Sequence, residues 1–176
     1  MPAAKDRVRG ASVSRNFPDI FPAAPAAAGI TGRDLGLLAL IGVFPLALFG
    51  AVALSGQSYF WGDLTYIHYG WRSLPAEQLQ RGALPLWNPF AYLGMPLAGE
   101  LQSAVWYPGT LPFYFLPFAA AVLLFLFAHF WLAGAFAFLW LRRSGFSRAA
   151  AAAAGVARML GGPLASRIRF LNHVWT

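Results

Sequence analysis

The sequence contains no cysteine, and only 11% of its 176 residues are charged. The absence of cysteine excludes disulfide bonds and thiolate metal ligands. The scarcity of charge, together with a hydrophobic content of 59%, excludes an ordinary soluble domain. Acidic residues are scarcest, 6 against 13 basic ones, which gives a net charge of +7. A chain this apolar is not a soluble nucleic-acid-binding domain, so the positive charge needs another explanation.

Two long stretches, 35–54 and 118–141, carry no charged residue at all. As helices they would reach about 30 and 36 Å, and the hydrocarbon core of a bilayer is about 30 Å thick. Each stretch therefore predicts a transmembrane helix. Pro45 does not argue against the first one, because membrane helices tolerate such residues when neighbouring groups satisfy the freed backbone.

A third apolar stretch, 149–165, starts with a run of alanines and is interrupted by Arg158. An arginine at the middle of a bilayer costs about 2.5–3.5 kcal/mol, although near a helix end it can reach the headgroups. We expect a short third membrane helix packed among other helices. A helix lying on the membrane surface is the alternative.

Basic residues are distributed unevenly around the two predicted spans. The loop between the spans contains only Arg72 and Arg81. The others near the spans are Lys5, Arg7, Arg9, Arg15 and Arg33 before the first, and Arg142, Arg143 and Arg148 after the second. The positive-inside rule then places the amino terminus in the cytoplasm and the loop outside, which also accounts for the net charge.

The sequence thus predicts an all-α, polytopic membrane protein with two to three transmembrane helices and a long first extracytoplasmic loop. The expected segments are a disordered cytoplasmic tail (1–33), a transmembrane helix (34–55), the extracytoplasmic loop with short surface helices (56–117), a transmembrane helix (118–141), a cytoplasmic turn (142–148), the short third membrane helix (149–165) and a truncated extracytoplasmic segment (166–176).

The loop is rich in aromatic residues, which favour a membrane-interface belt first and a carbohydrate-binding platform second. Pro75 is expected in the first turn of a short helix over 75–81, with Ser73 as its cap and Gly82 as its stop. Prolines and glycines over 83–96 predict an irregular, shaped loop instead of a continuous element.

Several short motifs occur in a consistent order and spacing: Gly62-Asp63, Arg81-Gly82-Ala83-Leu84-Pro85-Leu86-Trp87-Asn88-Pro89, Gly94-Met95-Pro96-Leu97, Gln102, Tyr107-Pro108, His129, Leu132-Ala133-Gly134 and Ser147-Arg148. This order resembles that of the YfhO-type bacterial membrane proteins of the GT-C glycosyltransferase superfamily. The motifs cover roughly residues 59–175, and the Leu-Trp-Asn-Pro and Gly-x-Pro-Leu pair is the most specific.

This resemblance implies a multispan enzyme of the bacterial inner membrane whose first outer loop builds the active site. The donor would be a polyprenyl-phosphate-linked sugar, and the acceptor a cell-envelope polymer, lipid or protein. Because family members are usually much longer, the chain is expected to be an amino-terminal fragment that is inactive when isolated. A non-catalytic multispan protein, such as a scaffold or a transport subunit, is the alternative.

Asp63, just after the first span, is the leading catalytic candidate. The resemblance implies that an acidic residue there either activates the acceptor or holds a divalent metal. Glycosyl transfer needs a base to take the acceptor proton and positive charge to stabilise the departing phosphate. Alternatively, Asp63 only caps a helix that follows the span.

Six further residues are candidates for binding the substrate. Glu100, beside Gln102, would supply a second carboxylate for a cation such as Mg²⁺, and plain solvent exposure is the preferred alternative. Arg72 and Arg81 would bind the donor phosphate or, equally, lipid headgroups. Trp87 and Asn88 combine a stacking face with an amide, which suits a sugar but also suits a rigid turn.

Overall fold

The structure, a computed structural model, describes residues 29–59, 62–166 and 168. The chain is mostly helical, as the sequence predicts. The long helices are α1 (Gly32–Leu54), α2 (Tyr69–Gln80), α4 (Phe118–Arg143) and α5 (Arg148–Leu160). The shorter elements are a π-helix η1 (Leu64–His68), the 3₁₀ helices η2 (Leu101–Ser103) and η3 (Pro108–Thr110), the helices α3 (Pro112–Phe115) and α6 (Gly162–Ala165), and the two-residue strands β1 (Trp87–Asn88) and β2 (Met95–Pro96).

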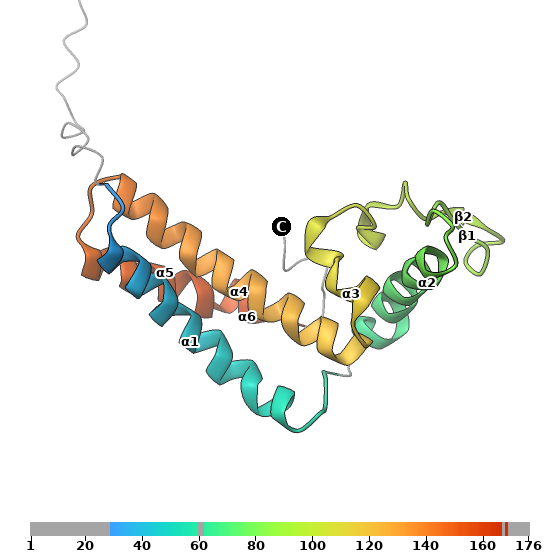
Figure 1. Cartoon of the computed structure of the whole chain (residues 1–176), viewed down its shortest axis with the longest axis horizontal. Coiled ribbons are helices and arrows are strands. Elements are labelled where there is room, and N and C mark those ends of the chain that lie inside the picture. Colours follow the sequence, from blue (N-terminus) through green and yellow to red (C-terminus); the bar gives the residue numbers. More distant parts are fainter. Residues whose placement is uncertain (1–28, 60–61, 167, 169–176) are drawn as a thin grey trace, which may run out of the picture.

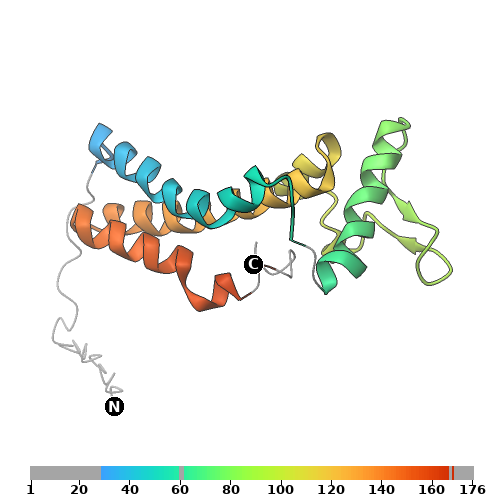
Figure 2. The ribbon, with the colours of Figure 1, turned by 90° about the horizontal axis from the view of Figure 1, so that it is seen from below.

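Helices α1, α4 and α5 lie side by side along the length of the molecule (Figures 1 and 2). The helices α1 and α4 are long and apolar enough to cross a membrane, and they occupy the two predicted stretches. Their contact is lined by Ile41, Phe49, Phe130 and Phe138, all buried. The rings of Phe49 and Phe130 meet edge to face with their centroids 5.2 Å apart.

Helix α5 packs along α4 through one stripe of buried residues. Its buried positions, Ala151, Gly155 and Met159, recur every four residues and so form one stripe. The helix predicted over 149–165 is divided at Gly161, which has an extended backbone. Pro163 then occupies the first turn of α6, where its missing N–H costs no helical hydrogen bond.

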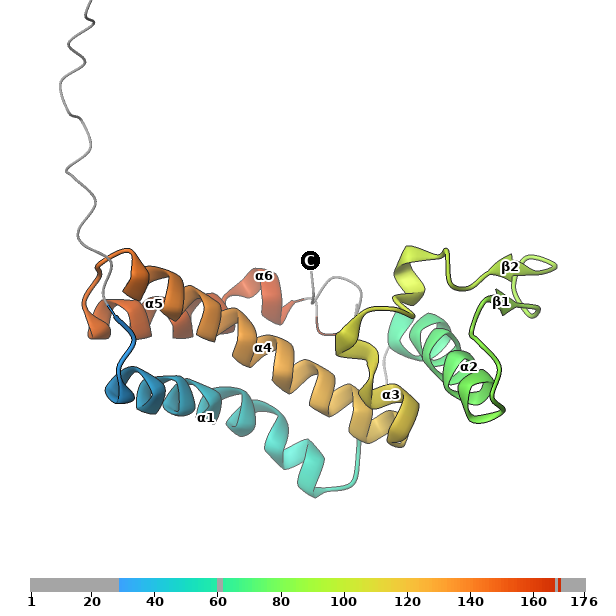
Figure 3. The ribbon, with the colours of Figure 1, turned by 45° about the horizontal axis from the view of Figure 1, so that its top comes forward.

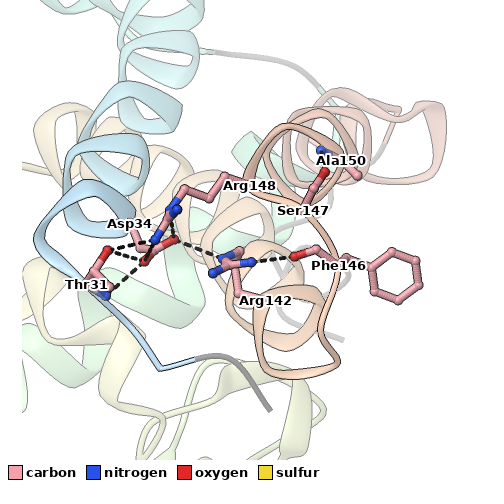
Figure 4. A network of polar contacts seen from close by, with 7 residues as sticks. All are labelled: Thr31, Asp34, Arg142, Phe146, Ser147, Arg148 and Ala150. Carbon is pink, nitrogen blue, oxygen red and sulfur yellow. Dashed lines mark hydrogen bonds and ion pairs between the residues drawn. The ribbon is translucent and has the colours of Figure 1, made fainter. Parts of the chain in front are cut away.

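A buried ion-pair network ties these three helices together at one end (Figure 4). The Asp34 carboxylate of α1 accepts hydrogen bonds from Nε of Arg142, at 3.0 Å, and from Nε of Arg148, at 3.1 Å. Thr31 completes a capping box with Asp34: its backbone N–H and hydroxyl donate to Oδ2 at 2.9 and 2.6 Å. Residues that the sequence marks only as flanking charges therefore join α1, α4 and α5.

The opposite end of the molecule holds α2 and the β1–β2 hairpin (Figure 1). Helix α3 leads from this part into α4, and Phe113 of α3 packs against Phe118 and Phe125. The strands pair antiparallel, with Trp87 opposite Pro96 and Asn88 opposite Met95. The rest of 83–96 is irregular, as its prolines and glycines predict.

The prediction for the start of the loop helix is wrong, and that for its end is confirmed. Helix α2 begins at Tyr69, directly after η1, so Ser73 and Pro75 lie inside it. Pro75 removes one helical hydrogen bond, but its ring is buried with Arg72 and Ala76 on the packed face, and this packing overrides local propensity. At Gly82 the backbone turns left-handed, with φ +73°, and the helix stops.

Candidate ligand-binding groove

Helix α2 and the β1–β2 hairpin lie next to each other (Figure 3). A groove of about 830 Å³ lies between them. One wall comes from η1 and α2, and the other comes from the hairpin and η2. The volume falls within the roughly 300–1,000 Å³ typical of small-molecule sites. Its aromatic lining consists of Tyr66, Trp71, Phe90 and Tyr92, and its polar side chains are Ser73, Glu77, Asn88, Glu100 and Gln102.

The π-helix η1 sets the first wall. Its wider turn brings Tyr66 and Ile67 to the groove just before α2 presents Trp71 and Leu74. π-Helical turns are rare and occur frequently at functional sites. Tyr66 is strongly exposed, so its ring is available to a ligand.

The hairpin tip supplies the second wall in a strained conformation. Tyr92 and Leu93 both have left-handed backbones, with φ +52° and +63°. The N–H of Gly94 donates to the carbonyl of Ala91 at 2.8 Å and closes the turn. Turns of this kind favour Asn and Gly, and a non-glycine residue held there costs of order 1–3 kcal/mol. This left-handed backbone brings Tyr92, which is 90% exposed, to the rim of the groove.

Among the predicted binding residues, the structure brings Asn88, Glu100 and Gln102 together in the groove. Asn88 is buried, and its Oδ1 accepts the N–H of Phe90 at 2.9 Å, so the turn role is present. Within the described chain its Nδ2 makes no hydrogen bond and remains available to a ligand. Oε1 of Glu100 accepts the N–H of Gln102 at 3.0 Å, and both residues line the groove.

Arg72 lies beneath the groove instead of lining it. Its side chain is 1% exposed and donates through Nη1 to the carbonyl oxygen of Ser103. The guanidinium carbon stands 5.7 Å from the ring centre of Phe113. Burial lowers the pKa of Arg72 to about 10, while the nearby Tyr114 acts in the opposite direction. Arg72 therefore stays charged at neutral pH and fixes the backbone that carries Glu100 and Gln102.

The other predicted residues stand outside the groove. Asp63 is at the N-cap of η1, where its side chain makes no capping hydrogen bond, and it does not line the groove. Arg81 is largely exposed and pairs with Glu77 at 3.9 Å. Trp87 turns its indole onto the backbone of Gly94, and its carbonyl accepts a hydrogen bond from Nε2 of Gln78 at 2.8 Å.

The carboxylates do not form a site for the divalent cation that the sequence suggests. Among the described residues, no three His, Asp or Glu side chains come together. One carboxylate oxygen of Glu100 already accepts a backbone N–H, and Asp63 does not line the groove. Since a hard cation needs several converging oxygen ligands, these residues do not fit Mg²⁺, and no chemical step is assigned to a metal.

A search of known proteins finds no family model, no curated protein and no solved structure that matches this chain. The YfhO-type resemblance therefore stays a prediction from the sequence motifs. A function must be inferred from the geometry of the groove and of the two apolar helices.

Proposed function

We propose that this protein is anchored in a bacterial inner membrane by α1 and α4. Only 17% of the most apolar part of α1 is buried inside the protein. Its exposed side chains include Leu40, Leu46 and Leu48, which need an apolar environment. A bilayer supplies this environment. The basic residues near Asp34 favour, by the positive-inside rule, a cytoplasmic amino terminus and a groove on the outside.

In this proposal the groove binds the sugar of a polyprenyl-phosphate-linked donor. Aromatic faces and a small number of polar groups are what an amphipathic ring with hydroxyl groups requires. Tyr66 and Tyr92 offer the faces, while Asn88, Glu100 and Gln102 offer hydrogen-bonding groups. This lining, held next to two membrane-length helices, is the observation that carries the proposal.

The reaction would be glycosyl transfer to a cell-envelope acceptor. The acceptor oxygen attacks the anomeric carbon, the bond from that carbon to the phosphate oxygen breaks, and polyprenyl phosphate leaves with the electron pair. Asp63 would take the acceptor proton. Asp63 lies three positions before Tyr66, so the acceptor would approach from the η1 end of the groove.

The location of Asp63 outside the groove favours a second candidate, a non-catalytic membrane protein that binds sugar as a scaffold or transport subunit. The two candidate functions differ in whether they require Asp63. Catalysis requires the Asp63 carboxylate, whereas binding alone requires only the groove.

Binding is tested on the purified protein in vesicles, as a change in tryptophan fluorescence on adding polyprenyl-phosphate-linked hexoses. Transfer is tested in native membranes, which supply the acceptor, as movement of radiolabelled sugar from the same lipids to the acceptor. We expect Asn88→Ala and Tyr92→Ala to weaken binding at least tenfold. Asp63→Asn should retain binding and abolish transfer.

Arg81→Gln is the matched control, because Arg81 is exposed and lies outside the groove. Transfer that persists in Asp63→Asn would refute the role of Asp63 as the base. Binding without any transfer in the unchanged protein would instead support the scaffold alternative. Unchanged binding in both groove variants would refute the carbohydrate site itself.

A further inference from the structure

We infer that residues 104–116 form a re-entrant segment that dips into the outer leaflet of the membrane beside α4, so that lipid acyl chains cover its exposed apolar side chains. This inference rests on the membrane placement of α1 and α4 proposed above. It concerns a lipid-contacting surface that the sequence assigns to an external loop.

A polar contact near each end of α4 marks a boundary of the proposed bilayer. At one end, Asp34 pairs with Arg142. At the other end, the hydroxyl of Ser58, just beyond α1, donates to the carbonyl of Ala119 at 3.3 Å. From Ala119 to Arg142 the helix rises about 35 Å, which is close to the roughly 30 Å of a hydrocarbon core. The Ser58–Ala119 contact thus marks the outer boundary.

The segment reaches well below this boundary. His129 lies ten positions past Ala119, about 15 Å along α4. Its ring points back towards the start of the helix and stacks on Phe125, with the ring centres 4.0 Å apart. The ring therefore lies about 10 Å below the level of Ala119. Tyr107 meets it there: its Oη is 2.6 Å from Nε2 of His129.

The backbone of the segment, and not only one long side chain, lies at this depth. A Cβ atom added to Gly109 of η3 would stand 2.9 Å from Cε1 of His129. Helix α3 then returns along the first turns of α4, where Phe113 packs on Phe118 and Phe125 (Figure 1). The chain therefore descends to η3 and climbs back to Pro117.

The chemistry of the segment suits lipid. No charged residue occurs anywhere in 101–141. Trp106, Leu111 and Phe115 are exposed by 62, 51 and 81%, so apolar surface faces outward. In water these side chains would form an exposed apolar patch. In the proposed membrane, the acyl chains that cover α1 and α4 also cover this patch.

Many polar groups of the segment are paired internally, as a position at membrane depth requires. The hydroxyl of Thr110, fully buried, donates to the carbonyl of Tyr107 at 2.6 Å, and that of Tyr114 donates to the carbonyl of Val105 at 2.6 Å. Turn hydrogen bonds employ the N–H groups of Tyr107, Thr110, Leu111, Tyr114 and Leu116. Pro108 and Pro112 have no N–H to satisfy.

The absence of cysteine allows a direct test with single nitroxide labels. Leu111→Cys and Phe115→Cys variants are labelled and reconstituted in vesicles of phosphatidylethanolamine and phosphatidylglycerol. Power saturation compares collision with oxygen, which enters lipid, against collision with a water-soluble nickel chelate. The references are Leu46→Cys on the exposed side of α1 and Leu93→Cys at the hairpin tip.

We expect the labels at 111 and 115 to show nickel accessibility several-fold below that at 93 and oxygen accessibility close to that at 46. If they resemble position 93 while position 46 reports lipid, the re-entrant segment is refuted and the membrane anchor stands. If position 46 also reports water, the membrane placement fails and the inference fails with it.

Discussion

Gly134 and Gly155 face each other where α4 crosses α5, and each leaves room for the backbone of the other. A Cβ added to Gly155 would lie 2.8 Å from the carbonyl oxygen of Gly134, closer than real Cβ atoms approach such an atom. One added to Gly134 would lie 3.0 Å from Cγ2 of Ile41. Small residues at this crossing let the helices approach closely, as is common between membrane helices.

Gly155→Ala should therefore push α5 away from α4. The obstacle is a backbone atom, which cannot move aside as a flexible side chain can, and overpacking of this kind costs about 1–3 kcal/mol. Thermal unfolding in detergent, followed by tryptophan fluorescence, measures the change. Gly36→Ala is the matched control, because no heavy atom lies within 4 Å of its added Cβ. Equal stability of the two variants would contradict the close crossing.

Asp34→Asn should lower the melting temperature several-fold more than Glu77→Gln does. Loss of the Asp34 charge leaves Arg142 and Arg148 close together without their shared counter-ion, whereas the Glu77–Arg81 pair is exposed and is worth less than about 1 kcal/mol. The same unfolding assay compares the two variants at low and high salt. A drop of equal size in both would show that Asp34 does not hold the bundle together.

The helical stretches are predictable from the sequence because their signal is local. Uncharged runs fix α1 and α4, and the glycine after Arg81 fixes the end of α2. The start of α2 was not predictable, since a proline normally marks a first turn and only the packing of Arg72, Pro75 and Ala76 keeps Pro75 inside the helix.

The candidate site was predictable only in part. The Trp-Asn motif and the Glu100–Gln102 pair pointed to residues near the groove, but Tyr66 and Tyr92 were missed as members of its wall. A π-helix and a left-handed Tyr-Leu turn have no local sequence signature, because tertiary contacts impose them. The Asp34 network was missed for a similar reason: 108 positions separate Asp34 from Arg142.

Arg72→Lys should loosen the backbone around Ser103. The lysine ammonium lacks the planar fork of the guanidinium, so it cannot keep the same contact with the Ser103 carbonyl and the Phe113 ring. We expect amide hydrogen exchange to rise at least tenfold over residues 100–104 and to stay unchanged in α5. Arg81→Lys, at an exposed position, serves as the control and should alter neither region.

The Tyr107–His129 hydrogen bond should show coupling in a double-mutant cycle. Nδ1 of His129 is 2.7 Å from the carbonyl of Phe125, which only accepts, so Nδ1 carries the proton and Tyr107 donates to Nε2. Tyr107→Phe alone should cost about 1 kcal/mol because it leaves Nε2 without its donor. In a protein that already carries His129→Leu, Tyr107→Phe should cost clearly less than it does alone. The difference between the two costs is the coupling energy, about 0.5–3 kcal/mol. Additive losses would mean that the two side chains act independently.

Gly82→Ala and Gly70→Ala should change the stability of α2 in opposite directions. Both glycines have open space around an added Cβ, so packing does not decide the result. Gly82 has φ +73° and ends the helix: Ala83 N–H donates to the Gln78 carbonyl at 2.8 Å and Gly82 N–H to the Leu79 carbonyl at 2.9 Å. An alanine there costs about 1–2 kcal/mol in the left-handed region.

Gly70, by contrast, has an ordinary helical backbone within α2, where alanine is better than glycine by about 0.5–1 kcal/mol. Hydrogen exchange of the α2 amides in each variant, compared with the unchanged protein, measures the local free energy of opening. Faster exchange in Gly82→Ala and slower exchange in Gly70→Ala is the expected pair of results. If Gly82→Ala does not exchange faster, the helix-stop role of Gly82 is refuted. If Gly70→Ala also exchanges faster, its added methyl group disturbs the groove, which Gly70 lines and Gly82 does not.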